Sequence, residues 1–339
     1  MTLILTRSTI RTLLADTLDA VEAAIAQAHR DLSDSKATLP TPPAMSLPAT
    51  TATPDTDSAT FLAMPAASTP ARLATVKLLA DLPANHAAGL PVQRSAVLAV
   101  DTTTGACLAL LDGAELTRIR TAAATAVATR ALARTDVTTL GLIGTGPLAY
   151  AHARALLPTR PYENVVLWGR TPTKAQTLAT WITTEFGIPA KAVDHPRTVT
   201  EAADVLCTLT PSRDPIIKGA WLSPGQHINA VGAPPRPDHR ELDTEAMVRS
   251  RIVIDAYDTA RTKSGEILIP LAEGALTKDD FHHELGDVLT HRTRGRTHND
   301  TDLTLFNSVG IGLQDLAITR LLIDLATHHG VGHDIDLAG

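Results

Sequence analysis

Residues 138–156 read TTLGLIGTGPLAYAHARAL. Its first six residues suit a buried strand, and its last nine lack Gly and Pro and suit a helix. Between them stand Gly144 and Gly146, followed by the small Ala149. The first glycine permits a tight turn, the second lets a diphosphate approach the backbone, and the small residue lets helix and strand pack closely. The stretch therefore predicts a dinucleotide-binding turn.

The surroundings of these glycines matter, because the pattern alone is weak. A second strand is expected at the right distance, over Asn164–Trp168, and helices over Leu148–Leu157 and Thr173–Thr184. Further short strands are predicted at Val205–Leu209, His227–Val231 and Ile252–Ile254. Such alternation predicts a parallel sheet with right-handed crossovers. The alternative is a tight strand-to-helix turn that holds no ligand.

The residues after the second strand bear on the choice of coenzyme. NAD-preferring proteins usually carry an acidic residue there, which binds the ribose 2′-hydroxyl. This chain instead reads WGRTPTK over residues 168–174. Arg170 and Lys174, with the hydroxyl of Thr171, suit a 2′-phosphate, which needs charge-assisted donors. NADP(H) is therefore expected in preference to NAD(H); the alternative for Arg170 is a solvated surface side chain.

Composition excludes several classes of protein. The 339 residues suggest about two domains, and the net charge of −6 without a basic stripe argues against nucleic-acid binding. No apolar run is long enough to span a membrane, and the N-terminus lacks the features of a signal peptide. The two cysteines, Cys107 and Cys207, form no disulfide framework, which favours a reducing cytoplasm.

The regions on either side complete the expected organisation. Apolar residues spaced by three and four from Ile10 to Ala28 predict one amphipathic helix. The Pro- and Thr-rich residues 36–60 read as an extended loop or edge strand, followed by strands over Thr60–Met64, Ala74–Leu79, Ala96–Val100 and Ala106–Leu111. Residues 114–134 are Ala-rich and predict a helix, and residues 303–328 are expected to be helical again. The fold class is α/β, with an additional α+β domain.

With these patterns in view, the chain resembles the ornithine cyclodeaminase/mu-crystallin family, specifically its reductase and dehydrogenase branch. Many short blocks in the right order make this resemblance more specific than the glycine turn alone. They are Leu5–Arg7, Met64–Pro65, Val76–Lys77, Leu110–Gly113, Ile119–Ala123, Thr208–Ser212, Asn229–Gly232, Arg240–Asp243, Ser264–Glu266, Leu305–Gly310 and Gln314–Leu316.

The resemblance implies a Rossmann domain, residues 118–310, inserted into a substrate-binding and dimerisation domain formed by residues 1–117 and 311–339. It also implies a homodimer joined through the sheets of the substrate domains. The nicotinamide is expected near Thr210, Val231 and Gly232. The full set of expected coenzyme-binding residues is Gly144, Thr145, Gly146, Pro147, Leu148, Arg170, Thr171, Lys174, Thr208, Leu209, Thr210, Val231, Gly232, Ser308 and Gly310.

The same resemblance gives candidate catalytic and substrate-binding residues. Lys77 matches the family's active-site lysine, Arg120 an arginine that holds the substrate carboxylate, and Asp315 a recurrent acid; Met64 is expected to contact the substrate. A guanidinium grips a planar carboxylate with two parallel bonds, and a lysine that relays a proton needs a lowered pKa. The alternatives are a surface cation for Lys77, a solvated helix face for Arg120, and a helix cap or ion pair for Asp315.

Three departures from the family pattern limit the chemistry. Ala44 stands where a second carboxylate-binding arginine is usual, and Leu62 where cyclodeaminases carry a glutamate for the distal amine. Residues 233–238, APPRPD, replace the aspartate that serves as their general base. An apolar Leu62 leaves an ammonium unpaired, at a cost of several kcal/mol.

The resemblance and its departures together imply NAD(P)H-dependent reduction of a small 2-imino acid, or the reverse oxidation of an amino acid. The alternatives are a redox-neutral amino-acid cyclodeaminase with tightly bound NAD and a non-catalytic, NADPH-binding, crystallin-like protein. The histidines near residues 282–298 and 328–333 match no usual metal-binding spacing, so no metal site is expected.

Overall fold

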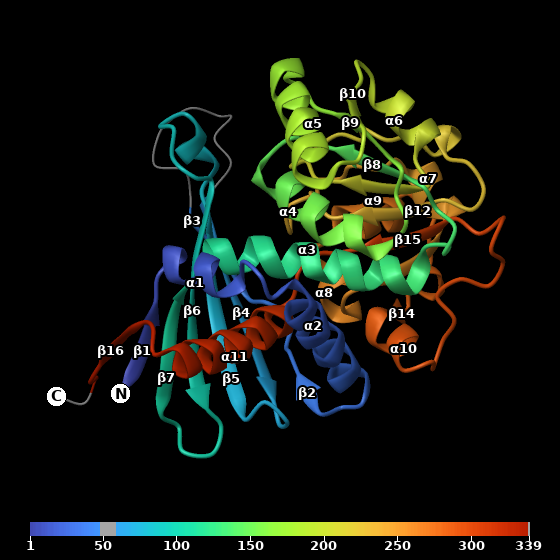
Figure 1. Cartoon of the computed structure of the whole chain (residues 1–339). Coiled ribbons are helices and arrows are strands. Elements are labelled where there is room, and N and C mark those ends of the chain that lie inside the picture. The colour runs from blue at the N-terminus through green and yellow to red at the C-terminus, as the bar shows by residue number, and fades with distance from the viewer. Residues whose placement is uncertain (48–58, 338–339) are drawn as a thin grey trace. The chain divides into compact units, whose positions relative to one another are not determined.

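The computed structural model describes residues 1–47 and 59–337, and it divides the chain into two compact units (Figure 1). Unit 1 comprises Met1–Arg120 and Ile311–Gly339, and unit 2 comprises Thr121–Gly310. The first boundary lies within a helix, slightly later than the residue 117 expected from the sequence. Residues 48–58, part of the expected loop, lie outside the described residues.

Unit 1 contains an eight-stranded mixed sheet with the order β16-β1-β7-β6-β5-β4-β2, and β3 also pairs with β4. All neighbouring pairs are antiparallel except β1 with β7. The strands expected from the sequence are present, with short edge strands in the Pro-rich stretch. The bounds are β1 (Thr2–Leu5), β2 (Ala37–Thr38), β3 (Ala44–Leu47), β4 (Ala59–Ser68), β5 (Leu73–Asp81), β6 (Gln93–Asp101), β7 (Cys107–Asp112) and β16 (His333–Ile335).

The two faces of this sheet differ in burial. Alternate side chains of β4 and β5, such as Leu62, Met64, Leu73 and Leu79, are buried on one face. Helix α11 (Gly312–His329) packs against β4 and β5 and against α2 (Leu18–Ser33). Figure 1 shows α1 (Arg7–Leu14), α2 and α11 in front of one face of the sheet. This helix-covered face forms the core of unit 1.

The N-terminal amphipathic stretch is two helices, not the single helix that the sequence predicted. Helix α1 ends at Leu14 and α2 begins at Leu18. Leu14 and Leu18 keep the four-residue apolar spacing across the break, so the periodicity does not reveal it. Of the helices in the described ranges, none is long and apolar enough to cross a membrane.

Unit 2 is a parallel sheet of eight strands with the order β10-β9-β8-β11-β12-β15-β13-β14. From β8 the chain adds β9 and β10 on one side, and then returns to add β11 and β12 on the other. The strand order therefore reverses between β8 and β11, and ligands of such sheets bind at the carboxyl ends of the strands at this point. The Rossmann architecture expected from the sequence is confirmed.

The strands and helices of unit 2 follow the expected alternation closely. Helix α3 (Gly113–Leu132) begins in unit 1 and continues here. The strands are β8 (Thr139–Ile143), β9 (Asn164–Trp168), β10 (Ala190–Ala192), β11 (Val205–Thr208), β12 (His227–Ala230), β13 (Arg251–Ile254), β14 (His283–Glu284) and β15 (Thr304–Asn307). The α-helices are α4 (Pro147–Leu156), α5 (Pro172–Phe186), α6 (Pro196–Ala202), α7 (Thr244–Arg249), α8 (Tyr257–Lys263), α9 (Gly265–Ala272) and α10 (Leu285–Leu289).

One expectation for the C-terminal part was wrong. The sequence predicted helix from residue 303, but Thr304–Asn307 forms β15, paired on both sides with β12 and β13. All four residues are buried, so their apolar pattern has neither helical nor alternating periodicity. A short, fully buried run of this kind cannot be assigned from periodicity alone.

Candidate active site

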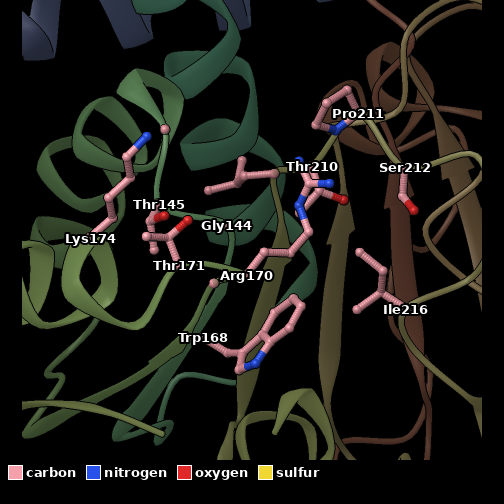
Figure 2. A pocket seen from close by; sticks show the side chains of 13 residues that line it. Gly144, Thr145, Trp168, Arg170, Thr171, Lys174, Thr210, Pro211, Ser212 and Ile216 are labelled. Atoms are coloured by element: carbon pink, nitrogen blue, oxygen red, sulfur yellow. The ribbon is translucent and has the colours of Figure 1, made fainter. Parts of the chain in front are cut away.

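A pocket lies at the carboxyl ends of β8, β9 and β11, where the strand order of unit 2 reverses (Figure 2). Eight of the expected coenzyme residues line it, together with five others. The lining residues are Gly144, Thr145, Gly146, Trp168, Gly169, Arg170, Thr171, Lys174, Leu209, Thr210, Pro211, Ser212 and Ile216.

Two glycines shape the turn from β8 into α4 for different reasons. Gly144 has φ +120°, and a Cβ there would lie 2.8 Å from the carbonyl oxygen of Leu209. Gly146, the residue before α4, has an ordinary φ of −79°, and a Cβ there would meet nothing within 4 Å. Gly144 is therefore required by the protein's own backbone, whereas the space beside Gly146 is open. An open helix N-terminus of this kind suits a diphosphate.

The pocket lining combines positively charged side chains with apolar ones. Arg170 follows β9, and Lys174 lies in the first turn of α5. In the view of Figure 2, Arg170 stands between Lys174 on one side and Ile216 and Ser212 on the other. The lining residues include no aspartate or glutamate. The side of the pocket next to β9 therefore offers donors for an anion and no acid to repel it.

Several expected coenzyme residues do not line this pocket. Thr208 is fully buried, and Gly232 packs against the end of β11, where its Cβ would lie 2.1 Å from the amide nitrogen of Thr210. The amide of Ser308 donates to Ala230, and the amide of Gly310 donates to Asp255 Oδ2 at 2.6 Å. The other residues outside the pocket lining are Pro147, Leu148 and Val231.

Sequence reasoning missed some of the residues around the pocket. Trp168, Gly169, Pro211 and Ser212 belong to quoted motifs but had no assigned contact, and Ile216 had no signal at all. Ile216 reaches the pocket only because the loop after β11 returns to the sheet edge, where its amide donates to Glu241 O.

In unit 1, three expected catalytic residues meet at one buried carboxylate oxygen. Lys77 Nζ lies 3.2 Å from Asp315 Oδ1, and Arg120 Nε lies 3.1 Å from the same atom. Lys77 comes from the middle of β5, Arg120 from the first part of α3, and Asp315 from the first turn of α11. All three are buried, with Lys77 only 1% exposed. Lys77 is therefore not a surface cation, and Arg120 does not lie on a solvated helix face.

The start of α11 approaches the sheet closely enough to bring these groups together because residue 312 is glycine. A Cβ on Gly312 would lie 2.6 Å from the carbonyl oxygen of Met64. Met64 stands opposite Lys77 in the pairing of β4 with β5 and is buried beside it. The sheet and the helix terminus therefore place Lys77 and Asp315 on facing surfaces.

Burial changes the acid–base behaviour of Lys77. Removal of the ammonium from water lowers the Lys77 pKa from 10.5 to about 8. The Asp315 carboxylate raises this pKa, and the Arg120 guanidinium lowers it further. Thr117 Oγ1 also lies 2.6 Å from Lys77 Nζ. A lysine with this pKa exchanges its proton close to neutral pH, as a proton relay requires.

A second layer of side chains holds Arg120. Its Nη1 donates to Gln314 Oε1 at 2.9 Å, and the Gln314 amide lies 3.2 Å from His29 Nε2. His29 is fully buried, and burial lowers its pKa to about 4, so it is neutral. The bonds of Arg120 to Gln314 and Asp315 fix the guanidinium plane and use only part of its donors, and the contact with His29 holds Gln314 in turn.

The positions that depart from the family pattern are neighbours on the sheet. Ala44 of β3 pairs with Leu62 of β4, which in turn pairs with Leu79 of β5. Leu62, Met64 and Leu79 form one buried apolar cluster on the face that carries Lys77. Across residues 1–47 and 59–337, no three His, Cys, Asp or Glu side chains are grouped to hold a metal ion.

The fold and the pocket define a dinucleotide-binding α/β protein. Residues 2–330 match the model of the ornithine cyclodeaminase/mu-crystallin family, and the chain belongs to that family. A Delta(1)-pyrroline-2-carboxylate reductase of Bacillus cereus is 34% identical over 278 residues, covering 82% of this chain and 85% of the relative.

Solved structures show the same architecture over the whole length. The Thermococcus litoralis Delta(1)-pyrroline-2-carboxylate reductase, in complex with NADH and L-proline, has a TM-score of 0.89 at 32% identity and covers 98% of this chain and 100% of its own. An archaeal alanine dehydrogenase dimer with bound NAD has a TM-score of 0.90 at 30% identity, with 99% of both chains covered.

Proposed function

We propose that this protein is an NADPH-dependent oxidoreductase that reduces a small 2-imino acid at its α carbon, or oxidises the corresponding amino acid. The observation that carries the proposal is the buried Lys77–Asp315–Arg120 cluster, in a chain whose other unit has a coenzyme pocket at its topological switch point. The relatives are named for reductase and dehydrogenase reactions on cyclic or acyclic imino and amino acids.

Arg120 supplies the carboxylate contact. Two of its five N–H groups bond Asp315 and Gln314, so the remaining donors on Nη1 and Nη2 suit the two oxygens of a substrate carboxylate. Because Gln314 and Asp315 hold the guanidinium in place, the substrate pays little ordering entropy for this contact. Arg120 is therefore the group that orients the substrate.

Asp315 has a free acceptor at the centre of the cluster. Its Oδ1 accepts from Lys77 and Arg120, whereas its buried Oδ2 has no hydrogen-bond partner among the described residues. A buried carboxylate oxygen without a partner is costly, so a ligand or water is expected to donate to it. The N–H of an iminium or amine is such a donor.

When bound, a nicotinamide coenzyme would supply the hydride. The residues of this chain supply position and charge. Arg120 fixes the carboxylate, Asp315 Oδ2 stabilises the positive nitrogen, and Lys77 exchanges a proton with it. The iminium is already electrophilic, so no further activation is needed.

We also propose that NADPH is preferred to NADH. Arg170, Thr171 and Lys174 at the end of β9 support this, together with the lack of an acidic residue in the pocket lining. Titration of the pure protein with both coenzymes tests it. Tighter binding of NADH would overturn the preference, and binding of neither would overturn the whole proposal.

The apolar cluster of Leu62, Met64 and Leu79 limits the side chains that a substrate can carry. Leu62 and Leu79 offer no partner to a distal ammonium or carboxylate, and Ala44 adds none. A substrate with an uncharged, compact side chain or ring therefore fits this face better than a diamino acid. Redox-neutral cyclodeamination of ornithine is disfavoured for the same reason.

The outer face of the unit 1 sheet supports a homodimer. Its strands present a continuous apolar surface in which Leu78 is 48%, Leu98 38% and Leu110 40% exposed. Large apolar side chains on one sheet face indicate a protein interface. Cys107 and Cys207 are both free thiols, which supports our proposal of a reducing compartment such as the cytoplasm.

The deciding experiment follows NADPH oxidation with a panel of cyclic 2-imino acids and with pyruvate plus ammonia or methylamine. We expect turnover with at least one imine, and loss of turnover in Arg120→Met. Arg118→Met is the matched control, because Arg118 lies two residues away on α3 and contacts Glu115 instead. Coenzyme binding without turnover of any imine would favour the non-catalytic alternative.

A further inference from the structure

One buried side chain, Glu241, links the chain segments that follow β11 and β12, and it has no role in the mechanism proposed above. Glu241 lies after β12, is fully buried, and accepts four hydrogen bonds with its carboxylate. Its Oε1 accepts from the amide and the hydroxyl of Thr210, at 2.6 and 2.7 Å. Its Oε2 accepts from the hydroxyl of Thr208 and the amide of Gly232, at 2.7 and 2.8 Å.

The four donors lie where β11 and β12 end, at Thr208 and Thr210 and at Gly232. Arg170, Thr171 and Lys174 after β9 would hold the adenosine phosphate on one side of the switch point, and the residues that end β11 and β12 would then face the nicotinamide half on the other. Thr210 lines the pocket on that side. Gly232 already packs against it, because a Cβ at Gly232 would lie 2.1 Å from Thr210 N.

The backbone of Glu241 is in turn held by a second buried glutamate, Glu266. Its amide donates to Glu266 Oε1 at 2.6 Å, and the amide of Leu242 donates to Glu266 Oε2. Glu266 is buried at the start of α9, and burial together with the Glu241 charge raises its pKa to about 8. Burial also raises the Glu241 pKa, while its donors oppose that shift. Glu266 thereby fixes the backbone that carries the Glu241 side chain.

We infer that Glu241 is a positioning residue for the nicotinamide half of the coenzyme: its carboxylate fixes the 208–210 and 231–232 loops against each other and so sets the surface on which the ring lies. This inference rests on the proposed function, since it needs a nicotinamide coenzyme. Glu241 itself touches neither coenzyme nor substrate; it acts through Thr210 and Gly232.

Glu241→Gln tests the inference because it keeps the shape of the side chain. Whichever way the amide faces, its NH₂ replaces an oxygen that a backbone N–H now uses, either that of Thr210 or that of Gly232. The hydroxyls of Thr208 and Thr210 can rotate to accept, but a backbone amide cannot. One of the two loops is therefore released.

The readout compares the whole coenzyme with its adenosine half. Calorimetry with NADPH and with 2′,5′-ADP is expected to show about tenfold weaker NADPH binding for Glu241→Gln and unchanged 2′,5′-ADP binding. The primary deuterium isotope effect from (4-²H)NADPH should rise toward its intrinsic value as hydride transfer becomes limiting. Glu245→Gln is the matched control, since Glu245 is exposed on α7 and its carboxylate pairs with Arg249 and not with Thr210 or Gly232.

The outcomes separate cleanly. Equal weakening of NADPH and 2′,5′-ADP would show a general structural role and overturn the inference, as would wild-type NADPH affinity in Glu241→Gln. Failure of the unchanged protein to bind NADPH would instead overturn the proposed function. If Glu241→Gln does not fold, Thr208→Val removes one donor and leaves the glutamate intact; it must then weaken NADPH, and not 2′,5′-ADP, by a smaller factor.

Discussion

Lys77 illustrates how one position in a strand acquires its chemistry. On β5 it stands among alternating buried residues, where an apolar side chain is usual. Its ammonium is stabilised there by Asp315, across 238 positions of sequence, against the cost of burial. The sequence motif located this lysine, but the lowered pKa depends on the packing of α11 over the sheet.

The Lys77 pKa predicts a pH dependence. With a pKa of about 8, Lys77 loses its proton as the pH rises through 8, so kcat/KM for imine reduction is expected to fall above that pH. Lys77→Arg, which stays protonated, should lack this limb even at low activity. Lys191→Met, at an exposed position on β10, should keep the wild-type profile. A limb near pH 8 that persists in Lys77→Arg would assign it to another group.

The same shift affects folding with a defined sign. The folded-state pKa of Lys77 lies below its unfolded value of 10.5, so the unfolded chain binds more protons between pH 8 and 10.5. The free energy of unfolding therefore rises with pH through this window, so Lys77 destabilises the folded state less at high pH than at low pH. Urea unfolding of the wild type and of Lys77→Met at pH 7.5 and 9.5 measures this contribution. The free energy of unfolding of the wild type, relative to that of Lys77→Met, should be higher at pH 9.5 than at pH 7.5.

Asp315→Asn should separate charge from shape. It leaves Lys77 and Arg120 as two buried cations without a counter-ion, so we expect a loss of about 3–5 kcal/mol in unfolding free energy. Because Asp315 raises the Lys77 pKa, its removal should also shift the limb of the rate profile to lower pH. A folded variant with an unshifted limb would contradict the role given to Asp315.

At the level of elements, the β8–turn–α4 unit shows which parts of the fold are local. Strand, turn and helix lie within residues 139–156, and their bounds agree with the prediction to within a residue or two. The prediction missed the break between α1 and α2, because the apolar spacing continues across it. It also wrongly assigned β15 to a helix, because this buried strand has no apolar periodicity. A fully buried run carries no periodicity, so its length and its flanking turn residues must separate strand from helix.

The two glycines of this turn give a matched pair of variants. Gly146→Ala adds a methyl group to open space in the pocket, so we expect an unchanged Tm and about tenfold or greater loss of NADPH affinity. Gly144→Ala forces φ +120° on a residue with a Cβ, 2.8 Å from Leu209 O. It should lower the free energy of unfolding by about 1–3 kcal/mol, and with it the Tm. Thermal unfolding and calorimetry distinguish them, and a normal affinity in Gly146→Ala would place the diphosphate elsewhere.

For the whole molecule, the unusual feature is the uncovered sheet face of unit 1. Its side chains are apolar on adjacent strands, so a monomer would expose them to water together. The residues are Ala63, Pro65, Val76, Leu78, Ala96, Leu98 and Leu110. Burial of such a face against a second copy stabilises by roughly 25 cal/mol per Å² of apolar area before the costs of association.

Leu98→Asp tests this association. A carboxylate in the middle of the apolar face cannot be buried without a partner, so the variant should sediment as a monomer where the wild type is a dimer. Val248→Asp is the control, because Val248 is 52% exposed in unit 2. A wild-type monomer in analytical ultracentrifugation at micromolar concentration would contradict the proposed dimer.

Sequence alone predicted the Rossmann unit and its glycine turn, because both depend on local spacing, and it offered Lys77, Arg120 and Asp315 as candidate site residues through the family resemblance. It could not show that the three meet at one carboxylate oxygen, that Asp315 Oδ2 is left without a partner, or that Glu241 joins two loops. Those facts arise from contacts between residues far apart in the chain. Burial and hydrogen bonding decide them, and both exist only once the sheets and helices have packed.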